Sequence, residues 1–142
     1  MKITFVDVLR RVYRDLVEGR SSLEIVPAQR GVEASTKPSF ILGMYRSGTT
    51  LLRYVLDSHS SLCSPPESHL PCALTALLDG RTARGLESLG FERAHRIQKI
   101  RELVDYFLNN YASARGVKRW VEKSPDSLDC LPLLAEAFPD GN

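Results

Sequence analysis

A glycine-bounded loop between a short apolar run and a helical pattern constrains the fold of this chain more than any other feature. Residues 39–42 form the apolar run directly before Gly43, and such a run is typical of a buried strand in a parallel sheet. After Gly48, the apolar residues of 51–56 recur with helical spacing. The order strand, loop, helix predicts an α/β fold, in which a parallel sheet is flanked by helices.

The chain divides into three predicted regions. Residues 1–20 carry apolar residues at helical spacing between charged ones, which predicts an amphipathic N-terminal helix with a solvated basic face. Residues 21–38 are rich in small, polar and turn-forming residues, as is typical of a linker. We expect residues 39–142 to form the α/β domain, with a long amphipathic helix around 97–108 and a strand within 117–123.

Turn signals separate the remaining predicted elements of the domain. Residues 60–66 are predicted as a turn, and the helical pattern of 70–78 is predicted to end at Gly80. The Ser-Pro-Asp sequence at 124–126 indicates the start of a helix that is predicted to reach Phe138. In a strand–helix–strand rhythm another buried strand should follow, so we expect a sheet that is incomplete at the C-terminus.

The composition excludes several classes of protein. The 142 residues are 43% hydrophobic and 25% charged, which is ordinary for one soluble globular domain. The formal net charge of +2 is too small to indicate nucleic-acid binding. The three cysteines are odd in number and form no C-x-x-C pair, which disfavours a zinc site or a disulfide framework. Charges interrupt every apolar run near the N-terminus, so the sequence predicts neither a signal peptide nor a membrane span. A cytoplasmic location is therefore predicted.

The loop itself has the chemistry of an anion site. Gly43 lets the chain leave the strand without a steric penalty, and Gly48 lets the backbone approach a ligand closely. The first turn of the following helix exposes unpaired N–H groups and the positive end of the helix dipole. One cation and three hydroxyl groups complete the set of donors: Arg46, Ser47, Thr49 and Thr50. Together they predict a site for a phosphate or sulfate group.

The spacing narrows the class of anion. Gly43 and Gly48 match the G-x-x-x-x-G frame of a P-loop, but Thr49 stands where a nucleotide triphosphatase has its lysine. Without that lysine a triphosphate loses its main countercharge. A P-loop-like sheet whose loop binds a single phosphate group, with Arg46 as the cation, is therefore favoured. The alternative is a P-loop kinase or nucleotide hydrolase, which would bind ATP in a magnesium-dependent manner.

The segment from Phe40 to Leu52 resembles the 5′-phosphosulfate-binding loop of sulfotransferases that use 3′-phosphoadenosine 5′-phosphosulfate. Its extension over 53–59 is similar to the bacterial and protein-tyrosine sulfotransferases, which also have arginine before Ser-Gly-Thr-Thr. The match covers 39–67. A second, looser match is Trp-Val-Glu-Lys-Ser-Pro at 120–125, which is similar to the Glu-Lys-Thr-Pro segment of the family.

The resemblance implies how the donor is bound. The following residues would bind its 5′-phosphate: Arg46, Ser47, Gly48, Thr49 and Thr50. Arg46 would also stabilise the leaving oxygen, and Lys123 would bind the sulfate oxygens, although a solvated lysine is also compatible with the sequence. No metal is implied. Trp120 packs either in the core or beside the nucleobase.

The resemblance also implies a base for the acceptor hydroxyl. Glu67 lies where protein-tyrosine sulfotransferases carry their catalytic glutamate, so Glu67, Arg46 and Lys123 are the predicted catalytic residues. A glutamate at a helix N-terminus near Pro66 would occur there without any catalytic role. His69 is a competing base, and His59 is a weaker candidate that more often ends a helix.

The donor and acceptor are defined to different degrees. The resemblance implies that 3′-phosphoadenosine 5′-phosphosulfate is the co-substrate and that a hydroxyl accepts the sulfuryl group. That hydroxyl could belong to a small molecule, a carbohydrate or a peptide. Members of the family bind the 3′-phosphate after the next strand, which the sequence does not reach. We therefore weigh a nonenzymatic alternative, a truncated and inactive P-loop-like module, which measurement of donor turnover would distinguish from an enzyme.

Overall fold

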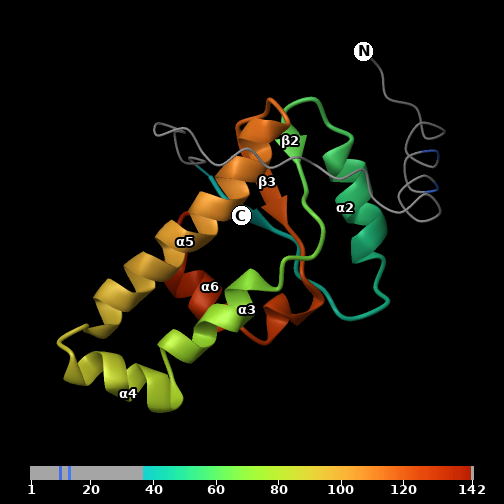
Figure 1. Ribbon diagram of the computed structural model, residues 1–142. Coiled ribbons are helices and arrows are strands. Elements are labelled where there is room, and N and C mark those ends of the chain that lie inside the picture. The colour runs from blue at the N-terminus through green and yellow to red at the C-terminus, as the bar shows by residue number, and fades with distance from the viewer. Residues whose placement is uncertain (1–9, 11–12, 14–36, 142) are drawn as a thin grey trace.

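The computed structural model describes Arg10, Tyr13 and residues 37–141. The N-terminal helix predicted for 1–20 lies outside the described residues except for Arg10 and Tyr13, and the linker predicted for 21–38 lies outside them except for 37–38. Both stay predictions. Figure 1 shows the α/β domain that the remaining chain forms.

Three short parallel strands form the sheet (Figure 1). They are β1 (Ser39–Phe40), β2 (Leu62–Cys63) and β3 (Arg119–Glu122), in the order β1-β3-β2. Phe40 pairs with Glu122 and Cys63 pairs with Trp120. Because the strands are parallel, the segments that follow them leave from the same edge of the sheet. The predicted parallel α/β fold is confirmed.

Strand β2 corrects the prediction of a turn over 60–66. Its two residues are too few to show the alternation that marks a strand in sequence. What makes it a strand is its pairing with β3 and the burial of Cys63, which is 1% exposed. Strand β1 is also shorter than the apolar run 39–42, although the Ile41 N–H still donates to the Glu122 carbonyl (2.9 Å).

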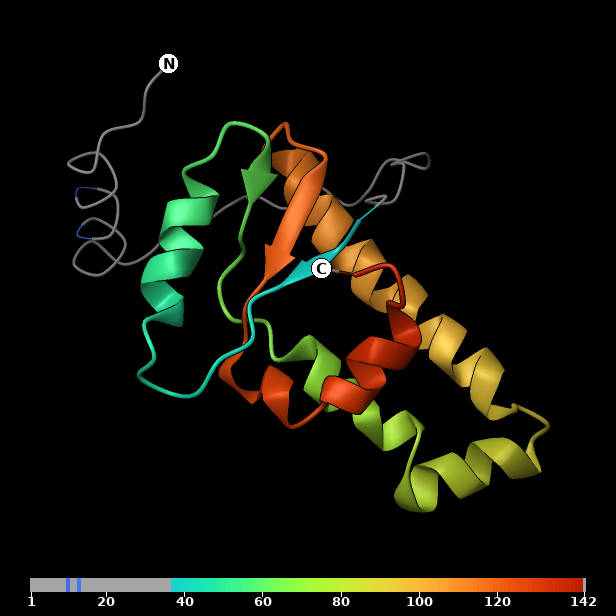
Figure 2. The same cartoon turned by 180° about the vertical axis from the view of Figure 1, so that it is seen from behind.

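Helices cover both faces of the sheet (Figure 2). Helix α2 lies on one side, and α5 and α6 lie on the other, in both views. The helical elements are α2 (Thr49–Asp57), α3 (Leu70–Leu74), η1 (Thr75–Leu77), α4 (Gly80–Ser88), α5 (Arg93–Ala114), η2 (Pro125–Leu128) and α6 (Leu131–Ala137). In the part of the chain that the structure describes, no helix combines the length and apolar content needed to cross a bilayer.

Two helix boundaries differ from those predicted. The preceding helical stretch ends at Leu77, Asp79 is extended, and α4 begins at Gly80, where the helix was predicted to end. The helix predicted from 124–126 to Phe138 is interrupted: η2 ends at Leu128, and α6 starts at Leu131. Pro132 explains the second start, because proline is favoured in the first turn of a helix and disfavoured in its interior.

Trp120 is the centre of the core. Its side chain is 0% exposed and packs edge-on against Phe40, with ring centroids 5.6 Å apart. Its Nε1 donates to the Asn109 Oδ1 of α5 (3.0 Å), so the indole N–H is satisfied. Ile100 and Val104 of α5 fill the same cluster. Of the two positions left open for Trp120, the structure therefore favours the core.

Polar contacts fix α2 to the segment after β2. The buried Asp57 accepts the Ser64 N–H (2.8 Å) and pairs with Arg115 at 3.2 Å. Arg53 donates to the Ser64 carbonyl (3.1 Å), and the Ser64 hydroxyl donates to the Val121 carbonyl of β3 (2.7 Å). These bonds determine where the chain enters the segment that carries Glu67.

Candidate functional site

The loop between β1 and α2 is held in shape by its own backbone. Gly48 is the N-cap of α2 and has a φ of 83°, a left-handed conformation that glycine adopts without steric cost. Arg46 is also left-handed, with a φ of 66°, which is uncommon for a residue with a Cβ. The N–H and hydroxyl of Ser47 both donate to the Met44 carbonyl, at 3.2 and 2.6 Å. The loop is thus a defined turn.

Gly43 is the tightest point of this loop. A Cβ added there would lie 2.5 Å from the Thr49 Cγ2 and 2.9 Å from the Ser47 Oγ. The backbone of Gly43, at the start of the loop, therefore lies close to the side chain of Thr49, at its end. Glycine is therefore favoured at 43 by close packing, whereas at Gly48 it is favoured by the backbone angle.

Substituting Gly43 tests this packing. We expect Gly43→Ala to lower the free energy of unfolding by about 1–3 kcal/mol, because the added methyl overpacks the loop against Thr49. The matched control is Gly85→Ala in α4, where the new Cβ meets no atom within 4 Å. That change should stabilise the protein by about 0.5–1 kcal/mol through helix propensity. Chemical denaturation measures both, and equal effects would contradict the packing of Gly43.

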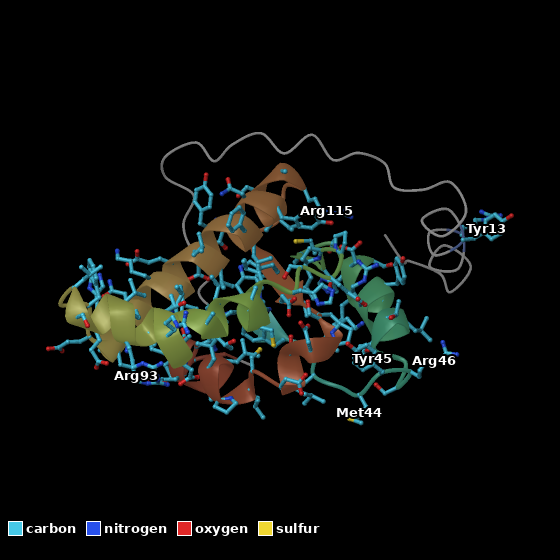
Figure 3. All side chains as sticks on the ribbon, turned by 60° about the horizontal axis from the view of Figure 1, so that its bottom comes forward. Tyr13, Met44, Tyr45, Arg46, Arg93 and Arg115 are labelled. Atoms are coloured by element: carbon cyan, nitrogen blue, oxygen red, sulfur yellow. The ribbon has the colours of Figure 1, made fainter. Side chains whose placement is uncertain are left out.

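The polar side chains of the loop face solvent. Arg46 is exposed, and Figure 3 shows it extending outward from the loop. Within residues 37–141, its guanidinium has no hydrogen-bond or ion-pair partner. Thr50 is exposed and Thr49 is half-buried, both at the N-terminus of α2. A helix N-terminus with a free cation beside it is suited to bind an anion.

Lys123 and Glu67 meet beside this edge of the sheet. Lys123 directly follows β3, its side chain is 4% exposed, and its Nζ donates to the Glu67 Oε1 at 2.5 Å. Glu67, which lies between β2 and α3, keeps 38% of its side chain exposed. Lys123 is thus not a solvated lysine. The pair places an ammonium group and a carboxylate together, and only the carboxylate is open to solvent.

His69 extends this pair. Its Nε2 lies 3.8 Å from the Glu67 Oε2, and its Nδ1 lies 3.0 Å from the Oδ1 of Asp126 in η2. The contact with Asp126 therefore orients the imidazole, and Glu67 lies close to its other nitrogen. His59 takes a different role at the end of α2, where its Nδ1 accepts the Ser61 N–H (3.0 Å). The structure brings together two of the three candidate bases.

Glu122 is a residue of this region to which the sequence pattern assigns no role. It is 0% exposed, and burial raises the pKa of its carboxyl. Its Oε1 accepts the hydroxyls of Ser124 (2.5 Å) and Ser68 (3.0 Å), and its Oε2 accepts that of Ser127 (3.3 Å). The signal that could have indicated it is an acidic residue inside an otherwise buried strand.

The described residues 37–141 contain no group of three or more His, Cys, Asp or Glu side chains that could hold a metal ion. The side chains described above can supply acid–base and electrostatic chemistry. A carboxylate and an imidazole are its possible bases, and Lys123 and Arg46 are its cations.

The fold and site together define an α/β protein with a glycine-bounded loop and a helix N-terminus at the carboxyl edge of a parallel sheet. The model of the sulfotransferase family matches residues 38–142, so this chain belongs to that family. It is 34% identical over 111 residues to the nodulation protein NoeE of Sinorhizobium fredii, a match that covers 71% of this chain and 26% of that protein. It is 30% identical over 115 residues to an uncharacterized protein of Aquifex aeolicus, covering 75% of this chain and 15% of that protein. The chain thus corresponds to about a quarter or less of these relatives.

Proposed function

We propose that this chain forms the donor-binding and catalytic part of a sulfotransferase that uses 3′-phosphoadenosine 5′-phosphosulfate. The observation that carries the proposal is the ion pair between the buried Lys123, which directly follows β3, and Glu67, which follows β2. Strand β3 lies next to β1, which leads into the Gly43 loop. A base, a cation and an anion-binding loop thereby start from adjacent strands. Membership of the sulfotransferase family supports it.

The loop would bind the 5′-phosphosulfate end of the donor. The residues proposed to do so are Arg46, Ser47, Gly48, Thr49 and Thr50. The open backbone at Gly48 and the outward-facing Arg46 support this proposal. The hydroxyl and the N–H of Ser47 both donate to the Met44 carbonyl, so the hydroxyl would exchange that bond for one to the phosphate when the donor binds.

The proposed reaction transfers the sulfuryl group to a hydroxyl. As the acceptor oxygen forms its bond to sulfur, its proton passes to Glu67, with His69 as the competing base. The bond between sulfur and the bridging oxygen breaks, and 3′-phosphoadenosine 5′-phosphate leaves with the electron pair. Lys123 and Arg46 stabilise the negative charge on the sulfate and bridging oxygens.

The acceptor is proposed only as a class. A carboxylate base next to a cation suits a neutral hydroxyl, whether it belongs to a small molecule, a carbohydrate or a peptide.

Binding of the product nucleotide tests the proposal. We expect calorimetry to show that 3′-phosphoadenosine 5′-phosphate binds without magnesium, and that Arg46→Ala weakens binding about 10- to 100-fold through loss of a charged hydrogen bond. The control is Arg84→Ala, which removes an exposed arginine of α4. Equal affinity of wild type and Arg46→Ala would reject the role of Arg46. Magnesium-dependent binding of ATP in place of this nucleotide would favour a kinase or nucleotide hydrolase.

A further inference from the structure

Glu122 connects the two segments that carry the proposed catalytic residues. It is the last residue of β3, directly before Lys123, and its side chain is fully buried. Ser68, which contacts it from the other segment, lies directly between Glu67 and His69. One buried carboxylate therefore joins the segment of the proposed base to the segment of the proposed cation.

The same carboxylate holds His69 from two directions. Ser68 precedes His69 and donates its hydroxyl to the Glu122 Oε1 (3.0 Å). The His69 N–H donates to the Ser124 hydroxyl (2.9 Å), which in turn donates to the same Oε1 (2.5 Å). Both contacts lead to the same oxygen atom of Glu122, so the backbone on the N-terminal side of the His69 Cα is fixed with respect to β3.

The backbone of His69 needs this support. Its φ is 52°, in the left-handed region that a residue with a Cβ seldom occupies. Such a conformation costs about 1–3 kcal/mol and persists only where the surrounding structure enforces it. The contacts that enforce it include those with Ser124, with Asp126 and, through Ser68, with Glu122, together with the bond that the His69 carbonyl accepts from the Ala73 N–H (3.1 Å).

We propose that Glu122 is a positioning residue that acts through Ser68 and Ser124 to hold Glu67 beside Lys123 and His69 beside Glu67. The geometric part of this inference stands on the contacts above, and the catalytic part rests on the proposed function. Glu122 does not itself reach solvent, because it is 0% exposed.

A carboxylate suits this role better than other side chains. Its two oxygens accept hydroxyl protons from three directions, whereas an amide would present donors on one side. Among residues 37–141, no lysine, arginine or histidine forms a salt bridge with Glu122. Burying an unpaired carboxyl is costly and raises its pKa, and the three serine hydroxyls offset part of that cost.

The three serines provide a matched test. Ser68→Ala and Ser127→Ala each remove one hydroxyl from Glu122, but only Ser68 belongs to the segment that carries Glu67 and His69. Because Ser68 also accepts the Leu70 N–H (3.3 Å), Glu122→Gln is needed beside it to change the carboxylate alone. The imidazole NMR signals of His69 report locally, and His59 and His95, the other two histidines, serve as internal references.

We expect Glu122→Gln and Ser68→Ala to shift the His69 signals and to leave those of His59 and His95 in place. Ser127→Ala should leave all three unchanged. In turnover assays, Glu122→Gln should lower kcat about 10- to 100-fold through misplacement of the base, with the affinity for 3′-phosphoadenosine 5′-phosphate kept within about twofold.

Three results would overturn the inference: unmoved His69 signals in Glu122→Gln, equal effects of Ser68→Ala and Ser127→Ala, or an equal shift of all three histidines. The last would show a general role in folding. The NMR comparison needs no bound nucleotide, so its outcome is separate from that of the binding experiment. A nucleotide that fails to bind would reject the proposed function, while a selective shift of His69 would still support the positioning by Glu122.

Discussion

Lys123→Met is expected to lower the turnover of sulfuryl transfer by about 10²–10³-fold, the loss typical when one preorganised donor to a developing charge is removed. Lys123 is the only cation that the described structure holds buried beside the proposed base, with its Nζ 2.5 Å from the Glu67 Oε1. Methionine keeps the length and apolar stem of the side chain, so the core contacts of the stem are retained. Folding should be affected little, because the Glu67 carboxylate left behind is 38% exposed and can be solvated.

The matched control is Lys118→Met, which removes an exposed lysine five residues earlier on the same strand segment. Steady-state kinetics should show wild-type turnover for this control. Lys123→Arg should restore little activity, because a planar guanidinium differs from a compact ammonium in size and hydrogen-bond geometry. A Lys123→Met enzyme with turnover within about threefold of wild type would contradict the proposed stabilisation of charge.

The sequence predicts local features of this site well and distant contacts poorly. The loop from Gly43 to Thr50 could be predicted because its strand, turn and helix start are contiguous, and each leaves its own signal. Glu67 and Lys123 are 56 positions apart in the sequence, so no local periodicity could predict that they form an ion pair. The resemblance to sulfotransferases gave each residue a role, but their ion pair appears only once β2 and β3 are paired.

Glu122 and β2 show why the rest could not be predicted. Serine is common on protein surfaces, so Ser68, Ser124 and Ser127 carry no signal that they converge on one carboxylate. Strand β2 is defined by its neighbour and not by its own two residues. In each case the structure depends on contacts between residues far apart in the sequence, and a local sequence pattern does not reveal such contacts.

Glu67→Gln is expected to lower turnover by about 10²–10⁴-fold, because glutamine keeps the shape of the side chain but cannot accept the proton of the acceptor hydroxyl. His69→Gln should reduce turnover by less than about tenfold, since it removes a neighbour of the base at 3.8 Å and leaves the base in place. Steady-state kinetics at saturating donor compares the two, and Glu87→Gln, an exposed glutamate of α4, is the control.

The reverse order of effects would assign the base to His69. Its Nδ1 faces the Asp126 Oδ1 at 3.0 Å, which is how a carboxylate orients a histidine that acts through its other nitrogen. In that case Asp126→Asn should lower turnover as well, whereas with Glu67 as the base Asp126→Asn should have an effect no larger than that of His69→Gln. Comparing these three variants therefore determines whether the proton of the acceptor passes to the carboxylate that Lys123 holds or to the imidazole that Asp126 orients.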